Sequence, residues 1–538
     1  MISRIRRPVD NAIILAAGFG SRFVPYTFEV PKGLVEVDGI PMIESQIKQL
    51  HEAGVTEIII VTGYLRDKYR PLINQYGLTE IYNPEYARTN TISSLWVARE
   101  HLKNTYILSS DNLLLENLYR SEETSSWYSL AYAKEYTSEW CVTLNDSDRI
   151  TDVNIGGADS WHMYGPVFFT SEFSHAFVPL LDESYAADGT SGWYWEDVLN
   201  RHLSELPPMY GRKTSDGVIW EFESWEELRE FDSSYCWTPR NQCIETICSV
   251  FGVKPESIYG IECLKQGMSN QSFTFWLDGE RFVYRKPGPG SEQYVDRENE
   301  GRVNSVISRL ELADDCIFFD TESGRKISRF ISGARSIDPM DWGEVSQAMK
   351  LLRRLHQSGA QVSQHFSLVD EIDHYESLVD LDDARQLWDD FDEVRGRIKT
   401  IIQWIGTEQI DEVLCHNDSN ATNFLIDPDG RMYLIDWEFA GMGDPLLDCV
   451  MFGLYSSFGP IRMKKLWEVY LQREPSSSES QRLNAYVALG GYLWSLWVVS
   501  RGNSYNNFEH YRETQFDFAR VYSMSVEAQI TSQETSCT

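Results

Sequence analysis

The chain has 538 residues, more than one ordinary hydrophobic core accommodates, so two or three domains are expected before any motif is considered. Hydrophobic residues make up 42% and aromatic residues 13% of the chain, which excludes a disordered protein. Lys and Arg number 48 against 81 Asp and Glu, and the formal net charge of -33 argues against nucleic acid and anionic membranes as partners.

The nine cysteines are scattered singly, without a CxxC pair. This pattern argues against a disulfide framework and a zinc site, and it favours a reducing, cytoplasmic location. The N-terminal segment starts basic and continues apolar, but the apolar run is too short for a signal peptide and enters a Gly-rich turn. A first β-strand is therefore expected there. No run approaches the ~18 apolar residues of a membrane span, so no membrane insertion is expected.

The first hundred residues alternate between strand-like and helix-like patterns, which predicts an α/β fold with a parallel sheet. An apolar run extends from Ala12 to Ala16 and is followed by Ile43, Ile47 and Leu50 at helical spacing. A β-branched run, Ile58 to Val61, comes next. A further strand, Tyr106 to Leu108, leads into Asp111. This acid is thus predicted at the carboxyl end of a strand, where α/β sheets bind ligands.

A Gly-rich motif, LAAGFGSR, follows the first predicted strand. Its glycines allow backbone amides to approach a polyphosphate, and the arginine and a later Pro-Lys pair supply positive charge. The predicted nucleotide-binding residues are Leu15, Ala16, Ala17, Gly18, Gly20, Arg22 and Lys32.

This motif, together with Pro31 to Val35, Gly63-Tyr64 and Ser110 to Asn112, resembles the sugar-phosphate and choline-phosphate nucleotidyltransferases over roughly residues 10–232. The resemblance implies a Rossmann-like domain in which Arg22 and Lys32 hold the phosphates of CTP. It implies nucleotidyl transfer, an in-line attack of an acceptor phosphate on the α-phosphorus, which Arg22 and Lys32 would catalyse by positioning and charge without a protein nucleophile. It also implies that Asp111 binds Mg²⁺. The second metal ligand is assigned to Glu223, with Glu221 as the alternative, because Mg²⁺ prefers two carboxylates plus substrate oxygens.

Aromatic residues stand beside carboxylates at two places in this half, in Glu139-Trp140 and in the run from Trp193 to Asp197. Such groups could form a cage for a quaternary ammonium through cation–π attraction, or they could simply pack in the interior. Similar segments occur in the bacterial choline-phosphate cytidylyltransferases. The predicted acceptor-binding residues are therefore Glu139, Trp140, Tyr194 and Trp195.

The helical pattern stops at a proline-containing stretch near residue 233, and a new helix-like segment begins at Cys243. This predicts a first domain over residues 1–232, a linker over 233–240 and a second domain over 241–538. The second domain opens with short β-like stretches at 272–277 and 281–285 and then becomes helical, and Ser476 to Ser480 is expected to be a polar loop.

A second motif, HNDSNATN, contains Asp418 and Asn423 and precedes an apolar strand that ends in Asp436. Kinase chemistry needs one acid to orient a hydroxyl and two oxygen ligands for Mg²⁺, and this order supplies all three. The alternative is that Asp418 and Asn423 merely cap a loop.

The motif resembles the choline kinase and aminoglycoside phosphotransferase family over roughly residues 241–525, which implies a two-lobed, protein-kinase-like α+β domain. By this resemblance Asp418 is the catalytic base, and Asn423 and Asp436 bind Mg²⁺. The ATP-binding residues would be Gly267, Ser269 and Asn270 of a short nucleotide loop, Arg285 as the strand cation and Glu300 as its helix partner. Lys286, one residue further, is expected on the other face of the strand.

A late helical run contains Trp494 and Trp497 at i and i+3, hence on one face, where they could surround a trimethylammonium group. A Trp pair at this spacing is more often core. The choline kinase resemblance, which extends to Gly441 to Asp448, favours substrate binding by both.

Together the halves predict a bifunctional enzyme that phosphorylates choline with ATP and converts phosphocholine and CTP to CDP-choline and pyrophosphate. The alternatives are ethanolamine or an aminophosphonate as acceptor, a sugar-1-phosphate transferase fused to an antibiotic kinase, and a fusion in which one half is an inactive scaffold. The expected partners are these small molecules, and the sequence leaves the oligomeric state open, a homodimer included.

Overall fold

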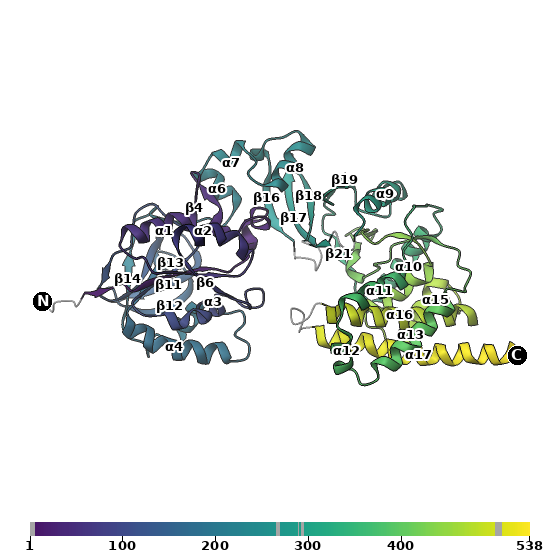
Figure 1. The fold of residues 1–538 in the computed structure, drawn as a ribbon. Helices are drawn as coiled ribbons and strands as arrows, with labels where there is room; N and C mark the ends of the chain where they lie inside the picture. The colour runs from purple at the N-terminus through teal and green to yellow at the C-terminus, as the bar shows by residue number, and fades with distance from the viewer. Residues whose placement is uncertain (1–5, 265–269, 289, 292–294, 501–507, 538) are drawn as a thin grey trace. The chain divides into compact units, whose positions relative to one another are not determined.

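The computed structural model describes residues 6–264, 270–288, 290–291, 295–500 and 508–537, with side chains as far as residue 532. The chain forms two compact units (Figure 1). The N-terminal unit comprises residues 1–265 and 273–279, and the C-terminal unit comprises 266–272 and 280–538. The predicted linker at 233–240 contains helix α7 (Ser234–Trp237), whose Tyr235 hydroxyl donates to the Glu36 carbonyl at 2.7 Å. The domain boundary assigned there stays a prediction.

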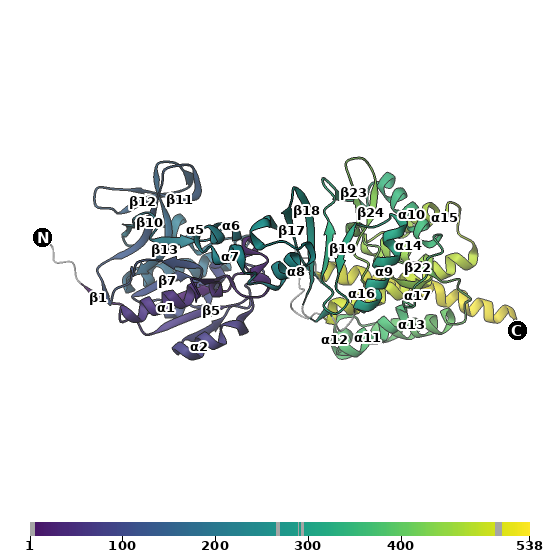
Figure 2. The same ribbon diagram turned by 90° about the horizontal axis from the view of Figure 1, so that it is seen from above.

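The N-terminal unit is built on a nine-stranded mixed sheet with the order β12-β11-β13-β7-β2-β5-β6, while β10 pairs with β13 and β14. Its strands are β2 (Asn11–Ala16), β5 (Ile58–Thr62), β6 (Thr79–Tyr82), β7 (Thr105–Ser109), β10 (Ser126–Ala133), β11 (Thr137–Leu144), β12 (Ile150–Gly157), β13 (Ser160–Phe169) and β14 (Met209–Lys213). The strands β7, β2, β5 and β6 are parallel neighbours, as the alternating pattern predicted. Figure 2 shows β11 and β12 extending as a long hairpin from the sheet.

Short strands and helices complete this unit. The strands are β1 (Arg7–Pro8), β3 (Glu36–Val37), β4 (Ile40–Pro41), β8 (Asn112–Leu114), β9 (Glu122–Glu123), β15 (Ile219–Glu221) and β16 (Tyr259–Cys263), with β17 (Asn270–Leu277) beside β16. The helices are α1 (Met42–Glu52), α2 (Arg70–Tyr76), α3 (Thr91–Val97), α4 (Ser171–Ala186), α5 (Trp195–Arg201), α6 (Trp225–Phe231) and α8 (Gln242–Phe251).

Helices cover both faces of the parallel strands, as Figure 1 shows. Ala12 and Ile14 of β2 pack in the core with α1 and α2, whereas Ile13 packs in the core with α3 and α4. This alternation follows from the two-residue period of a strand that is buried on both sides. The sheet therefore fixes the carboxyl ends of β2 and β7 side by side, where the Gly-rich motif and Asp111 lie.

The C-terminal unit has a small antiparallel sheet followed by a helical lobe, which is the protein-kinase-like layout expected. The strands are β18 (Glu280–Pro287), β19 (Cys316–Phe319), β20 (Lys326–Arg329), β21 (Arg335–Ser336), β22 (Val413–Cys415), β23 (Phe424–Ile426), β24 (Met432–Leu434) and β25 (Gly441–Gly443). The helices are α9 (Arg297–Ile307), α10 (Trp342–His356), α11 (Leu368–Leu378), α12 (Leu381–Leu387), α13 (Phe391–Ile405), α14 (Pro445–Tyr455), α15 (Pro460–Leu471), α16 (Ser477–Ser500) and α17 (Glu509–Cys537).

The predicted polar loop at Ser476 to Ser480 is wrong, because α16 begins at Ser477. The Ser476 hydroxyl accepts the Glu479 amide at 3.2 Å, and the Glu479 carboxylate accepts the Ser476 amide at 2.8 Å. This reciprocal pair is a capping box, so the serine run starts a helix. Within the described ranges, no helix combines the length and apolar character needed to cross a bilayer.

Candidate active sites

The Gly-rich loop leaves β2 at Ala16 and turns sharply at Gly20, whose φ is 67°. A Cβ at Gly20 would lie 3.1 Å from Thr27 Cγ2 and 3.3 Å from Lys32 Cβ, so the turn needs glycine. The Thr27 hydroxyl also donates to the Gly20 carbonyl at 3.1 Å. The loop and Lys32 are thereby held together, as the motif predicted for a phosphate-binding turn.

Lys32 lies among carboxylates at the end of β7. Its Nζ is 2.8 Å from Asp111 Oδ2 and 3.9 Å from Glu221 Oε1. Glu221 is brought there because β15 pairs with β8, which puts it opposite Asn112, and the Asn112 amide donates to its Oε2 at 3.1 Å. Burial, and then the charge of Asp111, raise the pKa of Glu221 to about 7.

Arg22 forms an ion pair with Glu223, and both side chains are exposed. Phe222, which lies between Glu221 and Glu223, is buried, whereas both acids are partly exposed, so both face away from the core. The structure therefore brings Arg22, Lys32, Asp111 and both candidate acids to one edge of the sheet. Glu221, the alternative in the sequence interpretation, shares Lys32 with Asp111, whereas Glu223 pairs with Arg22.

Asp111 and Glu221 fit a magnesium ion. Their oxygens are of the kind Mg²⁺ prefers, and the two half-buried carboxylates lie on either side of a single cation, the Lys32 ammonium. When bound there, the ion would supply positive charge to the polyphosphate and to the attacking phosphate oxygen.

Replacing each acid singly distinguishes the two candidates. We expect Glu221→Gln to raise the Mg²⁺ concentration for half-maximal pyrophosphate release about tenfold, the usual size of a lost metal contact. Glu223→Gln should shift it less than about threefold and should instead alter the KM for CTP through Arg22. A larger Mg²⁺ shift in Glu223→Gln than in Glu221→Gln would assign the ligand to Glu223.

The aromatic residues predicted to bind the acceptor are not equivalent. Trp140 on β11 is half-buried, Glu139 beside it is exposed, and Tyr194 is 44% exposed. Trp195 is only 3% exposed and its ring is parallel to that of Tyr128 at 6.1 Å. Trp195, the first residue of α5, thus points into the core against Phe169, and its assignment to acceptor binding stays a prediction.

In the C-terminal unit the loop after β22 carries Asp418. The Asn423 amide donates to Asp418 Oδ2 and to the Asp418 carbonyl, both at 2.9 Å. Burial raises the pKa of Asp418 to about 6, although hydrogen bonds from Tyr455 and Asn423 oppose this. Asp436 lies near this acid: burial, and further the charge of Asp418, raise the pKa of Asp436 to about 6.

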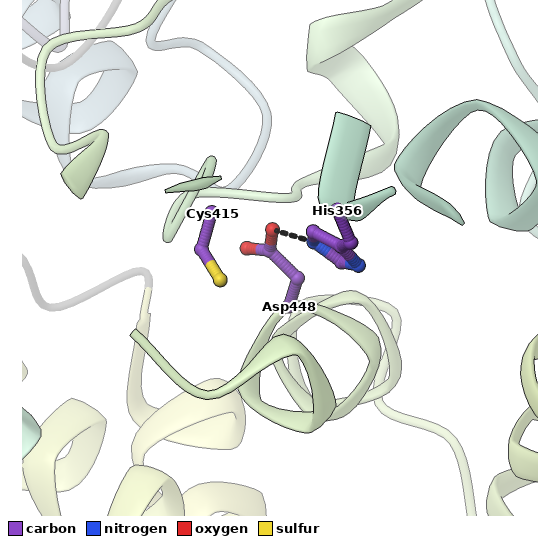
Figure 3. A group of neighbouring side chains, drawn as sticks. All are labelled: His356, Cys415 and Asp448. Carbon is purple, nitrogen blue, oxygen red and sulfur yellow. Dashed lines mark hydrogen bonds and ion pairs between the residues drawn. The ribbon is translucent and has the colours of Figure 1, made fainter. Parts of the chain in front are cut away.

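A buried group of side chains, His356, Cys415 and Asp448, supports the loop (Figure 3). Asp448 accepts the backbone amides of His416 at 2.7 Å and Asn417 at 2.6 Å, and it accepts from His356 Nε2 at 2.9 Å. Burial alone would raise the pKa of Asp448, but these hydrogen bonds hold it below its usual range. The ligand atoms of the three residues lie within 4.8 Å of one another, yet the carboxylate and imidazole are already engaged, so the group anchors the catalytic loop.

Arg285 is the cation at the nucleotide end of this unit. Its guanidinium lies 2.6 Å from Glu300 Oε1 and 3.4 Å from Asp436 Oδ1. Lys326, which the sequence analysis missed, is the strand partner of Arg285 on β20, and its charge also acts on Asp436. Of the predicted nucleotide loop, Gly267 and Ser269 lie outside the described residues. Asn270 donates to Glu438 at 3.4 Å.

Aromatic rings stand directly beside Asp418. Tyr455 hydrogen-bonds to the Asp418 carboxylate, and the rings of Tyr455 and Trp494 are 5.0 Å apart. The Trp494 side chain is half-buried. The ring of Trp497 lies 6.0 Å from that of Trp494, and Trp497 is only 9% exposed. Sequence analysis missed Tyr455. The sequence did contain a signal for Tyr455: it follows Asp448 by seven residues, so two helical turns place both side chains on the same face of α14.

Comparisons with known proteins divide along the same two units. Residues 12–115 match the family described as MobA-like NTP transferase domain, and residues 260–476 match the phosphotransferase enzyme family.

The choline-phosphate cytidylyltransferase of Streptococcus pneumoniae is 33% identical over 222 residues, 41% of this chain and 96% of that protein. The 2-aminoethylphosphonate cytidylyltransferase of Lancefieldella rimae is 33% identical over 235 residues, 43% of this chain and 95% of that protein. The solved choline kinase LicA of Streptococcus pneumoniae has 25% identity and a TM-score of 0.45, covering 52% of this chain and 97% of that one.

The two folds and the two acid sets thus define a fused transferase with a nucleotidyltransferase unit and a phosphotransferase unit. More particularly, the chain belongs to the bacterial cytidylyltransferase family that includes the two relatives named above. Its C-terminal unit adds a kinase-type phosphotransferase to that family's domain.

Proposed function

We propose that the C-terminal unit transfers the γ-phosphate of ATP to choline and that the N-terminal unit then transfers CMP from CTP to the phosphocholine formed. The observation that carries the choline assignment is the aromatic wall of Tyr455 and Trp494 beside Asp418. Ring faces attract a quaternary ammonium, which has no N–H to donate to a carboxylate. The order of steps follows from the chemistry, since the kinase product is the nucleotidyl acceptor.

In the kinase step, Asp418 orients the choline hydroxyl and accepts its proton as the oxygen attacks the γ-phosphorus and ADP leaves. Arg285, held by Glu300, would bind the ATP phosphates. Asn423 and Asp436 would hold Mg²⁺, which would supply positive charge to the transferring phosphoryl group.

In the nucleotidyl step, a phosphate oxygen of phosphocholine attacks the α-phosphorus of CTP, a P–O bond forms, and pyrophosphate leaves with the electrons of the broken bond. Lys32 and Arg22 would stabilise the charge that develops on the phosphates. Asp111 and Glu221, which both lie beside Lys32, would hold Mg²⁺. Because the acceptor phosphate attacks CTP directly, no protein nucleophile is needed, and the chain's own residues act by position and charge.

A primary amine acceptor, ethanolamine or an aminophosphonate, is the second candidate. The 2-aminoethylphosphonate cytidylyltransferase matches this chain as closely, at 33% identity, as the choline-phosphate enzyme does. Three carboxylates lie near the Tyr128 hydroxyl: burial raises the pKa of Tyr128, and the charges of Glu196, Glu221 and Glu139 raise it further. Such carboxylates suit an ammonium group that can donate hydrogen bonds. A homodimer and a cytoplasmic location remain predictions from the sequence.

A substrate panel tests the assignment. Choline, ethanolamine and 2-aminoethylphosphonate are supplied with ATP, and the phosphorylated alcohols and the phosphonate are supplied with CTP. ADP and pyrophosphate release are measured. We expect choline and phosphocholine to give the highest kcat/KM. A higher value for ethanolamine, or for the phosphonate with CTP, would replace choline with the primary amine.

Trp494→Leu tests the aromatic wall in the kinase unit. We expect the KM for choline to rise about tenfold, the size of a desolvated cation–π contact, while the KM for ethanolamine changes less than about threefold. The control is Trp237→Leu, whose exposed indole lies outside both sites. Equal changes for both alcohols would show that Trp494 contributes packing rather than recognition of the methylated ammonium.

A further inference from the structure

Lys326 is a buried lysine in the C-terminal unit that the kinase step as described above does not use. It stands directly opposite Arg285, because β20 pairs with β18 in the register that joins these two residues. Residues directly opposite on neighbouring strands project from the same face of the sheet. Arg285 is 8% and Lys326 6% exposed, so two positively charged side chains lie next to each other in the interior.

Each of the two cations has a carboxylate of its own. The Arg285 guanidinium lies 2.6 Å from Glu300 Oε1, whereas Lys326 Nζ lies 2.9 Å from Asp314 Oδ2 and 3.1 Å from Asp314 Oδ1. Asp314 comes from the segment between α9 and β19, and its side chain is 12% exposed. Like charges directly opposite each other on a sheet are destabilising, and a buried charge without a partner is more so. The Lys326–Asp314 pair therefore neutralises the second cation beside Arg285.

Asp436, the proposed metal ligand, lies beside the same cations. Its Oδ1 is 3.4 Å from the Arg285 guanidinium, a longer contact than that of Glu300, and its side chain is 27% exposed. A carboxylate held this loosely and open to solvent fits Mg²⁺, which prefers such oxygens. Burial raises the pKa of Asp436, while the charge of Arg285 and, to a smaller extent, that of Lys326 oppose the rise. Both cations thus lie within electrostatic reach of the carboxylate that the metal needs.

We propose that Asp314 is a positioning residue of the kinase unit, which holds the Lys326 ammonium away from Asp436 and so keeps that carboxylate available to Mg²⁺. The inference rests on the proposed kinase step. Without Asp314, Lys326 would be a buried cation without a partner, and its flexible four-carbon stem lets the ammonium move to another acid. Asp436 is that acid, because Arg285, the strand neighbour of Lys326, already reaches it. An ammonium there would repel the metal ion and occupy the oxygens that it needs.

Hydration is the competing fate of a displaced Lys326. Asp314 lines a cavity of about 550 Å³ that is bordered by the end of β20 and by the turn between β23 and β24. An ammonium that turned into this cavity would be solvated and would leave Asp436 unaffected. The two fates predict different Mg²⁺ requirements, so one titration separates them.

The test uses the full chain with Asp314→Asn, with Asp314→Asn combined with Lys326→Met, and with Asp315→Asn as the matched control. Asp315 is the next residue, but its pair with Arg329 Nε at 3.2 Å is exposed. ADP release with choline, followed against the Mg²⁺ concentration, gives kcat and the half-saturating concentration. Binding of Mn²⁺, a paramagnetic ion that also takes octahedral oxygen ligands, is measured by electron paramagnetic resonance with a non-hydrolysable ATP analogue. This second readout uses the Asp111→Asn background, which weakens the other proposed metal site.

We expect Asp314→Asn to raise the half-saturating Mg²⁺ concentration and the dissociation constant of Mn²⁺ about tenfold, the usual loss when a residue that supports a metal ligand is changed. The kcat at saturating Mg²⁺ should fall less than about threefold, because excess metal displaces the lysine. The double variant should return both metal constants to within about threefold of the wild type, since no unpaired ammonium remains. Asp315→Asn should change neither constant more than about twofold, because exposed ion pairs contribute little.

Two results would overturn the proposal. One is an unchanged metal requirement in Asp314→Asn, which would mean that Lys326 is hydrated in the cavity. The other is a requirement that stays raised in the double variant, which would make Asp314 a structural support of its segment. The double variant leaves no unpaired charge, so this second result is obtained even where Asp314→Asn alone does not fold. Failure of the proposed function is a separate outcome, because the wild type would then release no ADP with any alcohol, while Mn²⁺ binding would still report on the pair.

Discussion

Asp418→Asn should lower ADP formation with choline by about 10²- to 10⁴-fold, the usual contribution of a general base in a positioned site. The amide cannot accept the hydroxyl proton, although it keeps the shape of the side chain and its contact with Asn423. Pyrophosphate release from CTP and phosphocholine should stay within about twofold of the wild type. The control is Asp429→Asn, an exposed aspartate in the turn between β23 and β24.

The pH profile gives a second readout of the same residue. Burial raises the pKa of Asp418 from its usual range to about 6, and the ionised form is the one that accepts a proton. The kcat/KM for choline should therefore be constant above pH 7 and fall about tenfold per pH unit below pH 6, since protonation removes the base. A profile that is flat down to pH 5 would contradict this role for Asp418.

Asp111→Asn should lower pyrophosphate release by at least about 10²-fold and leave ADP release unchanged. Asp111 is the acid that pairs with Lys32 at 2.8 Å, so its loss would remove a proposed metal ligand and would also free Lys32 from its fixed position. Asp216→Asn, in an exposed loop of the same unit, is the matched control. Excess Mg²⁺ should recover part of the lost rate.

Retention of more than a tenth of the wild-type rate in Asp111→Asn would count against the metal site. Loss of ADP release in the same variant would mean that the two units are not catalytically independent. If wild-type protein shows one activity but not the other under every condition, the inactive unit is a scaffold, which is the remaining alternative from the sequence.

Local sequence patterns predicted the parts of the sites that depend on one strand and the loop after it. Gly20 is one example, because the turn after β2 needs glycine. Asp111 and the loop with Lys32 are others, because β2 and β7 are parallel and bring their carboxyl ends to one edge of the sheet. The same holds for Asp418 and Asn423, five residues apart on one loop.

Patterns left the position of a side chain open where it depends on contacts between distant segments. The choice between Glu221 and Glu223 depends on β15 pairing with β8, which joins segments about a hundred residues apart and leaves no local signal. The burial of Trp195 depends on how α5 packs against Phe169, and composition does not distinguish the inward from the outward side of a helix start. Tyr455 was missed because α14 meets the Asp418 loop only in the folded protein.

The most direct measurement is complementation between the two single variants, with choline, ATP, CTP and Mg²⁺ supplied together and the choline products followed by ³¹P NMR. We expect Asp111→Asn alone to accumulate phosphocholine, Asp418→Asn alone to leave choline unchanged, and an equal mixture of the two proteins to form CDP-choline. A mixture that forms no CDP-choline, while the wild-type chain does so, would contradict two independent transfer sites acting in sequence.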